Sequence, residues 1–194
     1  VNYIDKEIMK GDIAEAKLFN PDFIIANMHW GLEYERIPSR EQRELADWLL
    51  RQGVDLVIGS HPHVVQPMEL RRGKEGVTDR LVVYSLGNFI SNMSREHTDG
   101  GVMVKVVLGR KGLRRYIISA QYSLIYSSRY KNEQGKEDIR VVPAASWSGK
   151  NQNSSFSVDS ALIKYVNNTR LFLKGNNKEV EELSLIHISE PTRP

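Results

Sequence analysis

The sequence predicts an α/β fold with an antiparallel, β-rich second half, and three features support this prediction. In the first half, helical patterns alternate with short apolar strands over short links, which favours parallel strand pairing. In the second half, alternating apolar residues on both sides of a turn indicate an antiparallel hairpin. The chain has 194 residues, of which 40% are hydrophobic and 26% charged, enough for one domain with a real core.

Two helices are expected in the first half, and the second has clear signals at both ends. A rough apolar stripe predicts a helix from Ile4 to Phe19, ended by an Asn-Pro-Asp sequence. A second helix is predicted over Arg40–Gln52, where leucine and tryptophan supply the buried face. Ser39 is its expected N-cap, with Gln42 three residues later as in a capping box. Gly53 closes this helix, as glycine often does just past a helix C-terminus.

Three apolar runs in the first half predict buried strands, and each run ends in polar residues. The runs are Phe23–Met28, Asp55–Ile58 and Leu81–Leu86. The segment Gln66–Arg80 is expected to be a loop, because it holds proline, glycine and several charges. Open α/β sheets place their sites at the carboxyl ends of strands. The sequence therefore predicts one site assembled from several strand ends.

The second half is expected to contain three strands and a helix. Gly101–Leu108 alternates apolar residues between two faces, and Leu113–Tyr126 is expected to pair with it through a glycine-containing turn. Ile139–Val142 is predicted as a short strand that ends at a proline, and Ser157–Leu173 as a helix. Polar segments at 91–99, 130–138 and 146–155 are expected to be loops.

Three histidines at the predicted strand ends are the main candidates for chemistry. His29 follows the first strand, and His61 and His63 flank Pro62 after the second. Residues i and i+2 of an extended chain point the same way, and proline biases its predecessor toward extended geometry, so both imidazoles are expected to face one point. Imidazole is the commonest protein ligand for borderline divalent metals, which predicts a site for zinc, manganese or iron. Taken singly, each histidine has an ordinary alternative role in surface or core hydrogen bonding.

The polar and aromatic neighbours of these histidines each have two interpretations. Glu33 and Asp99 either orient a metal-binding histidine or are solvated loop charges. Asn88, just after the third strand, either bonds a ligand or loop backbone or is a turn residue that tolerates unusual φ. Trp30 and Tyr34 either wall a substrate cleft or pack in the core.

The charge pattern gives no support for a nucleic-acid partner, because the net charge is only +3 and the basic residues are dispersed. Arg71, Arg72 and Lys74 lie just past the histidines and would suit an anionic polymer; the alternative is a solvated loop. His97 lies in a polar segment and is expected at the surface. The absence of cysteine excludes disulfides and cysteine-bound metals, and the longest apolar runs are far short of a membrane span.

Both ends of the sequence have unusual features. The chain begins at Val1, inside what reads as a continuing fold, so a signal upstream would not be visible. The segment 183–194, L-S-L-I-H-I-S-E-P-T-R-P, resembles translated sequencing-adapter DNA, with a natural polar tail as the alternative. We therefore expect one partial domain over 1–182 and a tail outside the fold, from a gene truncated at both ends.

Three motifs together resemble the CapA family of bacterial poly-gamma-glutamate capsule biosynthesis proteins. They are M-H-W-G-L-E-Y at 28–34, G-S-H-P-H-V-V-Q-P at 59–67 and Y-S-L-G-N-F at 84–89. The similarity is good over Val1 to Val107 and loose beyond it. It implies a layered α/β sandwich of the calcineurin-like metallophosphoesterase type, here truncated at its N-terminal side.

The resemblance also implies a dinuclear metal site at strand ends. His29 would bind one metal, and His61 and His63 would be divided between the two. Ser60 departs from the superfamily motif, which has glycine directly before the first histidine. The earlier ligands and the usual catalytic histidine are expected upstream of Val1.

Two functions remain open on this resemblance. The first is a capsule biosynthesis or export protein that holds poly-gamma-glutamate or another anionic envelope polymer, working with capsule-assembly membrane proteins. The second is a metal-dependent phosphoesterase-like hydrolase that acts on a cell-envelope substrate. Family members are typically membrane-anchored and face outward, so the cell envelope is the expected location.

Overall fold

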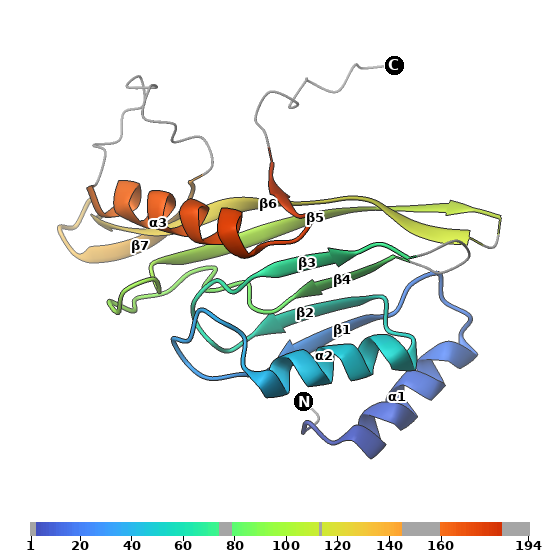
Figure 1. Ribbon diagram of the computed structural model, residues 1–194. Coiled ribbons are helices and arrows are strands. Elements are labelled where there is room, and N and C mark those ends of the chain that lie inside the picture. The colour runs from blue at the N-terminus through green and yellow to red at the C-terminus, as the bar shows by residue number, and fades with distance from the viewer. Residues whose placement is uncertain (1–2, 74–78, 113, 145–159, 184–194) are drawn as a thin grey trace.

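The computed structural model describes residues 3–73, 79–112, 114–144 and 160–183, which form two β-sheets and three helices (Figure 1). The predicted α/β class is confirmed, with a mostly parallel sheet followed by an antiparallel one. The two helices of the first half lie beside the first sheet, and the third helix lies over the second sheet (Figure 1). No helix within these described ranges is long and apolar enough to cross a membrane.

The helices of the first half begin and end where their capping residues place them. Helix α2 (Arg40–Gln52) has the predicted bounds, because the side chains and backbone amides of Ser39 and Gln42 form a reciprocal capping box. Gly53 ends it in the left-handed conformation with φ of 99°. Helix α1 (Lys6–Leu18) begins after the expected Ile4, because the Asp5 carboxylate accepts hydrogen bonds from the first-turn amides.

The first sheet has the strand order β1-β2-β4-β3. Strands β1 (Ile25–His29), β2 (Leu56–Ser60) and β4 (Arg80–Val83) are parallel, as the apolar runs predicted. Strand β3 (Met68–Arg71) pairs antiparallel with β4 inside the segment that was expected to be a loop. That expectation was wrong because β3 is only four residues long and lies among proline, glycine and charged residues, which mask its alternation.

The second sheet is the predicted antiparallel hairpin with additional strands. Strands β5 (Gly100–Lys111) and β6 (Arg114–Lys131) are both longer than predicted, and β7 (Glu137–Pro143) continues the sheet. A short strand, β8 (Glu181–Glu182), pairs with β6. Helix α3 (Ser160–Asn176) covers this sheet. The loop expected at 146–155, the expected helix residues 157–159 and the tail from 184 onward lie outside the described residues.

The two faces of the first sheet support two apolar cores, because successive strand residues point to opposite faces. On one face, Val57 and Val82 pack with Leu49 of α2 and with α1. On the other face, Leu56 and Leu81 pack against the second sheet and α3. Strands β2 and β4 are therefore covered on both sides, whereas the edge strand β1 is largely exposed, and the carboxyl ends of all three strands meet at one edge of the sheet.

Candidate functional site

Three histidine rings gather at the carboxyl ends of neighbouring parallel strands. His29 is the last residue of β1, and His61 and His63 follow directly after β2. The ring centres of His29 and His61 are 4.5 Å apart, and those of His61 and His63 are 6.2 Å apart. His29 is exposed, whereas the other two are half-buried. The structure thus brings together the three side chains that the sequence singled out.

The backbone reaches this arrangement by a tight bend and not by the expected extended segment. His61 has φ of 101° and His63 has φ of 61°, both in the left-handed region that non-glycine residues rarely adopt. The bend is held by a hydrogen bond from the Tyr34 amide to the Pro62 carbonyl, at 2.8 Å. The prediction that an extended backbone would bring the rings together was therefore wrong in its reason, because the backbone bends at both residues. Strained residues of this kind cluster at functional sites, where the surrounding structure holds them in place.

Asn88 fixes the orientation and the tautomer of His63. Its side-chain nitrogen donates to the carbonyl of Thr98 at 3.0 Å, which leaves its oxygen Oδ1 as an acceptor 2.9 Å from Nδ1 of His63. Nδ1 of His63 must therefore carry the proton in this contact, and the neutral ring keeps its lone pair on Nε2. Asn88 thus bonds a loop backbone, as one sequence interpretation expected, and it also holds the ring of His63.

Tyr34 forms the other support of His63. The two rings are stacked with centres 6.1 Å apart and an interplanar angle of 28°. The guanidinium of Arg95 lies on Tyr34, 4.0 Å from the ring centre. Glu33 contacts the hydroxyl of Tyr34, and this hydrogen bond raises the pKa of Tyr34 above its usual range. No sequence pattern singled out Arg95, since it lies in a polar loop without a recognisable motif.

Trp30 packs in the core and does not wall a cleft. It is 4% exposed, and its indole nitrogen donates to the carbonyl of Tyr84 at 2.8 Å. Gly59 makes this possible, because a Cβ atom at that position would lie 2.0 Å from the Tyr84 carbonyl oxygen and 2.5 Å from the Trp30 indole nitrogen. Ser60 has a similar supporting role, since its hydroxyl donates to the Met28 carbonyl across β1 and β2.

Asp99 and His97 lie together in the loop that follows Asn88. The charge of Asp99 acts on His97 and on Tyr165 of α3. His97 was expected at the surface and is half-buried. Burial, followed by the nearby charge of Arg36, lowers the pKa of His97 below its usual value.

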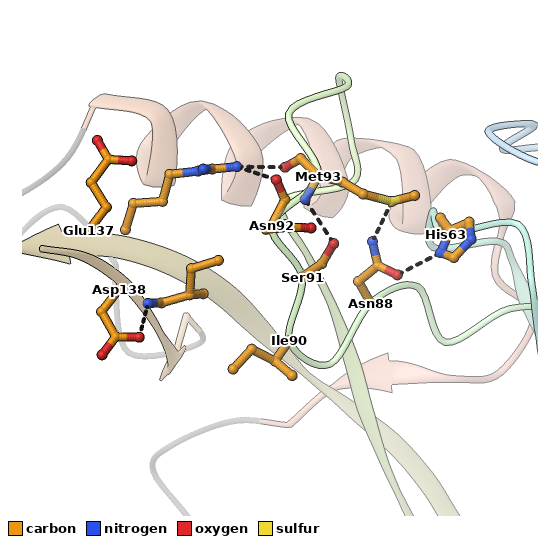
Figure 2. A pocket seen from close by; sticks show the side chains of 10 residues that line it. His63, Asn88, Ile90, Ser91, Asn92, Met93, Glu137 and Asp138 are labelled. Atoms are coloured by element: carbon orange, nitrogen blue, oxygen red, sulfur yellow. Dashed lines mark hydrogen bonds between the residues drawn. The ribbon is translucent and has the colours of Figure 1, made fainter.

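A pocket of about 690 Å³ opens beside His63 and Asn88 (Figure 2). The loop 88–93, β6 and the start of β7 line it. In Figure 2, His63 lies at one end of this pocket, and Glu137 and Asp138 lie toward the other. The guanidinium of Arg129 is already used by the carbonyls of Asn92 and Met93. The sequence missed these second-sheet residues because long-range packing, and no local pattern, brings them to the histidines.

The basic cluster expected beside the histidines does not form there. Strand β3 runs back along β4, so Arg71 pairs in register with Arg80, at the opposite end of the sheet from the histidines. Arg71 forms ion pairs with Asp47 and Glu69. Arg72 is paired with Asp79 and bonds the carbonyl of Ile117. Lys74 lies outside the described residues. These arginines therefore join elements of the fold.

The histidines have the donor chemistry of a metal site without completing one. Imidazole nitrogen suits zinc, manganese and iron, and the contact of Nδ1 with Asn88 leaves Nε2 of His63 without that partner. Within the part of the chain that the structure describes, no group of three His, Cys, Asp or Glu side chains could hold a metal ion. A full coordination shell would need further ligands. The three imidazoles by themselves do not form a metal centre in this structure.

The fold, with a mostly parallel sheet followed by an antiparallel one, fits the expected truncated α/β domain of the metallophosphoesterase-like type. Residues 1–93 match the family described as bacterial capsule synthesis protein PGA_cap. Over this segment, which is a little under half of the chain, the protein is similar to that family, the CapA family.

Two curated relatives are similar to the chain over more than half of its length. The chain is 34% identical to the PGA biosynthesis protein CapA of Bacillus subtilis (strain 168) over 115 residues, which are 59% of the chain and 28% of the relative. It is 35% identical to the capsule biosynthesis protein CapA of Bacillus anthracis over 107 residues, which are 55% of the chain and 24% of the relative. The match thus spans about a quarter of the length of each relative.

Proposed function

We propose that this protein acts in capsule biosynthesis and that its strand-end histidines bind a divalent metal ion. The biosynthetic role is supported by the names of both relatives, which refer to capsule or PGA biosynthesis. The metal proposal is carried by one observation, the gathering of the His29, His61 and His63 rings at the ends of β1 and β2. Strained backbone at two of the three histidines supports it further.

In this proposal, His29, His61 and His63 supply part of the coordination shell of zinc, manganese or iron, and other parts of the full-length protein supply the rest. Asn88 holds Nδ1–H of His63 so that Nε2 faces the metal, as partners of metal-binding histidines commonly do. Tyr34 limits rotation of the same ring by stacking. A bound divalent metal would polarise a phosphoryl or carbonyl oxygen and lower the pKa of a bound water.

The proposed substrate is poly-gamma-glutamate or another anionic polymer of the cell envelope, handled together with capsule-assembly membrane proteins. The names of the relatives favour this substrate class and a cell-envelope location. A membrane anchor and an outward-facing orientation remain part of the proposal. The second candidate is a metal-dependent phosphoesterase-like hydrolase, which the histidines at parallel strand ends favour.

The metal proposal is tested by elemental analysis of purified full-length protein after dialysis. We expect stoichiometric metal in the wild type and its loss in His61→Asn. The matched control is His97→Asn, because His97 also has a positive φ, of 68°, and asparagine tolerates such backbone. A metal-free wild-type protein, or a His61→Asn variant with full metal content, would contradict the proposal.

A second experiment separates the two candidate functions. The full-length protein is assayed for phosphodiester hydrolysis, and the same variants are tested for capsule polymer production in cells. Metal-dependent turnover that His61→Asn abolishes would favour the hydrolase. Loss of polymer without any phosphodiester turnover in the wild type would favour the biosynthesis or export role.

A further inference from the structure

The backbone of Arg95 is tied to the histidine site through Thr98. The amide and the hydroxyl of Thr98 both donate to the Arg95 carbonyl, at 3.1 and 2.6 Å. Thr98 is fully buried, and its own carbonyl accepts the hydrogen bond from Asn88 that fixes His63. The turn that carries Arg95 is therefore anchored to the same side chain that orients His63.

The side chain of Arg95 provides a second connection to His63, through Tyr34. Its guanidinium lies 4.0 Å from the centre of the Tyr34 ring, and that ring stacks on His63. Tyr34 is itself fixed by a φ of 69° and by its amide bond to the Pro62 carbonyl. Arg95 is thus separated from His63 by the ring of Tyr34 alone. Its side chain is held by that ring, and its backbone is held by Thr98.

The charge of Arg95 is not neutralised by the protein in the ranges that the structure describes. No carboxylate there lies within ion-pair distance of Arg95, whereas Arg71, Arg80 and Arg170 each pair with at least one. The adjacent carboxylate, Glu96, is paired with Lys164 at 3.4 Å. Arg95 is also exposed, so the guanidinium has one face on Tyr34 and N–H groups open to solvent.

We propose that Arg95 binds an oxyanion, a carboxylate or a phosphate, on the ligand that occupies the histidine site. Guanidinium N–H groups recognise both anions in the same bidentate manner. The pocket beside His63 and Asn88 is a poor alternative, because Glu137 and Asp138 line it and its arginine is bonded to carbonyls. This inference rests on the proposed function, since it assigns to Arg95 the anionic group of that function's substrate.

The test is titration calorimetry on full-length protein incubated with divalent metal, with two probes, inorganic phosphate and a γ-linked glutamate oligomer. Replacing Arg95 by alanine is expected to raise the dissociation constant of the bound probe about tenfold, since hydrogen bonds to charged groups have this strength. Arg95→Lys is expected to recover part of the affinity for the probe, because lysine keeps the positive charge but cannot form the two parallel hydrogen bonds of a guanidinium. The probe that shows the effect identifies the source of the oxyanion.

The control variant is Arg51→Ala, which removes an exposed arginine from the last turn of α2 and should leave both affinities unchanged. Metal content and thermal melting are measured on the same samples, so that a loss of fold is recognised. If the wild type binds neither probe, or Arg95→Ala binds as the wild type does, the inference is wrong. If the protein contains no metal but Arg95→Ala still weakens probe binding, the proposed metal-binding function is contradicted and the inference about Arg95 is not.

Discussion

Nδ1 of His63 lies 2.9 Å from Oδ1 of Asn88, and the carboxamide cannot turn because its nitrogen is bonded to Thr98. Replacing Asn88 by alanine should therefore release the tautomer of His63 and weaken metal binding about 10- to 100-fold. Metal affinity and the 15N shifts of the imidazole report the two effects. Asn92→Ala is the matched control in the same loop, because Arg129 uses only the backbone carbonyl of Asn92. An Asn88→Ala protein with unchanged affinity would show that the orientation of His63 has no effect on binding.

Gly59 should not tolerate any side chain. A Cβ atom there would overlap the Tyr84 carbonyl and displace the Trp30 indole, so Gly59→Ala should destabilise the fold by about 3 kcal/mol or prevent folding. Chemical denaturation measures this loss. In Gly175→Ala the new methyl group meets open space on α3, so this control should be neutral or up to about 1 kcal/mol more stable. Equal stability of the two variants would refute the steric argument.

Arg72→Ala should lower stability and leave ligand binding alone. Arg72 joins Asp79, Glu179 and the Ile117 carbonyl, and its removal leaves Asp79 with only amide donors. We expect a loss of about 1–2 kcal/mol in the free energy of unfolding. Affinity for a γ-linked glutamate oligomer should remain that of the wild type. A selective loss of polymer affinity with normal stability would restore the basic-cluster hypothesis.

Stability should fall at alkaline pH because of buried tyrosines. Burial raises the pKa of Tyr84 and of Tyr122 to about 12. Above the unfolded pKa of about 10, the unfolded chain loses these protons while the folded chain keeps them, so unfolding becomes easier as the pH rises toward 12. Urea melts between pH 8 and 11 should show the decline, and Tyr122→Phe should reduce it. The control is Tyr3→Phe, since Tyr3 is 90% exposed. An identical decline in both variants would rule out Tyr122 as a cause.

Local signals predicted α2 well, because its capping residues and apolar stripe all lie within the segment itself. The sequence also predicted that His29 and His61 approach each other, since parallel strands bring their carboxyl ends to one edge. It could not predict the left-handed bend at His61, which depends on the contact between Tyr34 and Pro62. Nor could it place Arg95, which reaches the site only through folding of the whole loop onto the sheet.

Arg71 illustrates the opposite error, in which closeness along the chain was taken for closeness in space. The segment after His63 reverses direction as β3, so each further residue moves away from the strand ends. The reversal depends on the pairing of β3 with β4, a contact that no local pattern in such a short strand specifies. In this sheet, the residues after β2 stay near the histidine site only until the chain reverses direction into β3.

The two sheets should also form at different times during folding. Strands β5 and β6 pair as far as Lys111 and Arg114, which are only three positions apart in the sequence, so this pairing costs little chain entropy. In the other sheet, Ile25 pairs with Leu56 only after the intervening helix has been accommodated. Hydrogen-exchange labelling during refolding should therefore protect the β5 and β6 amides first. The strand ends that carry His29 and His61 would be assembled late, on a hairpin that is already in place.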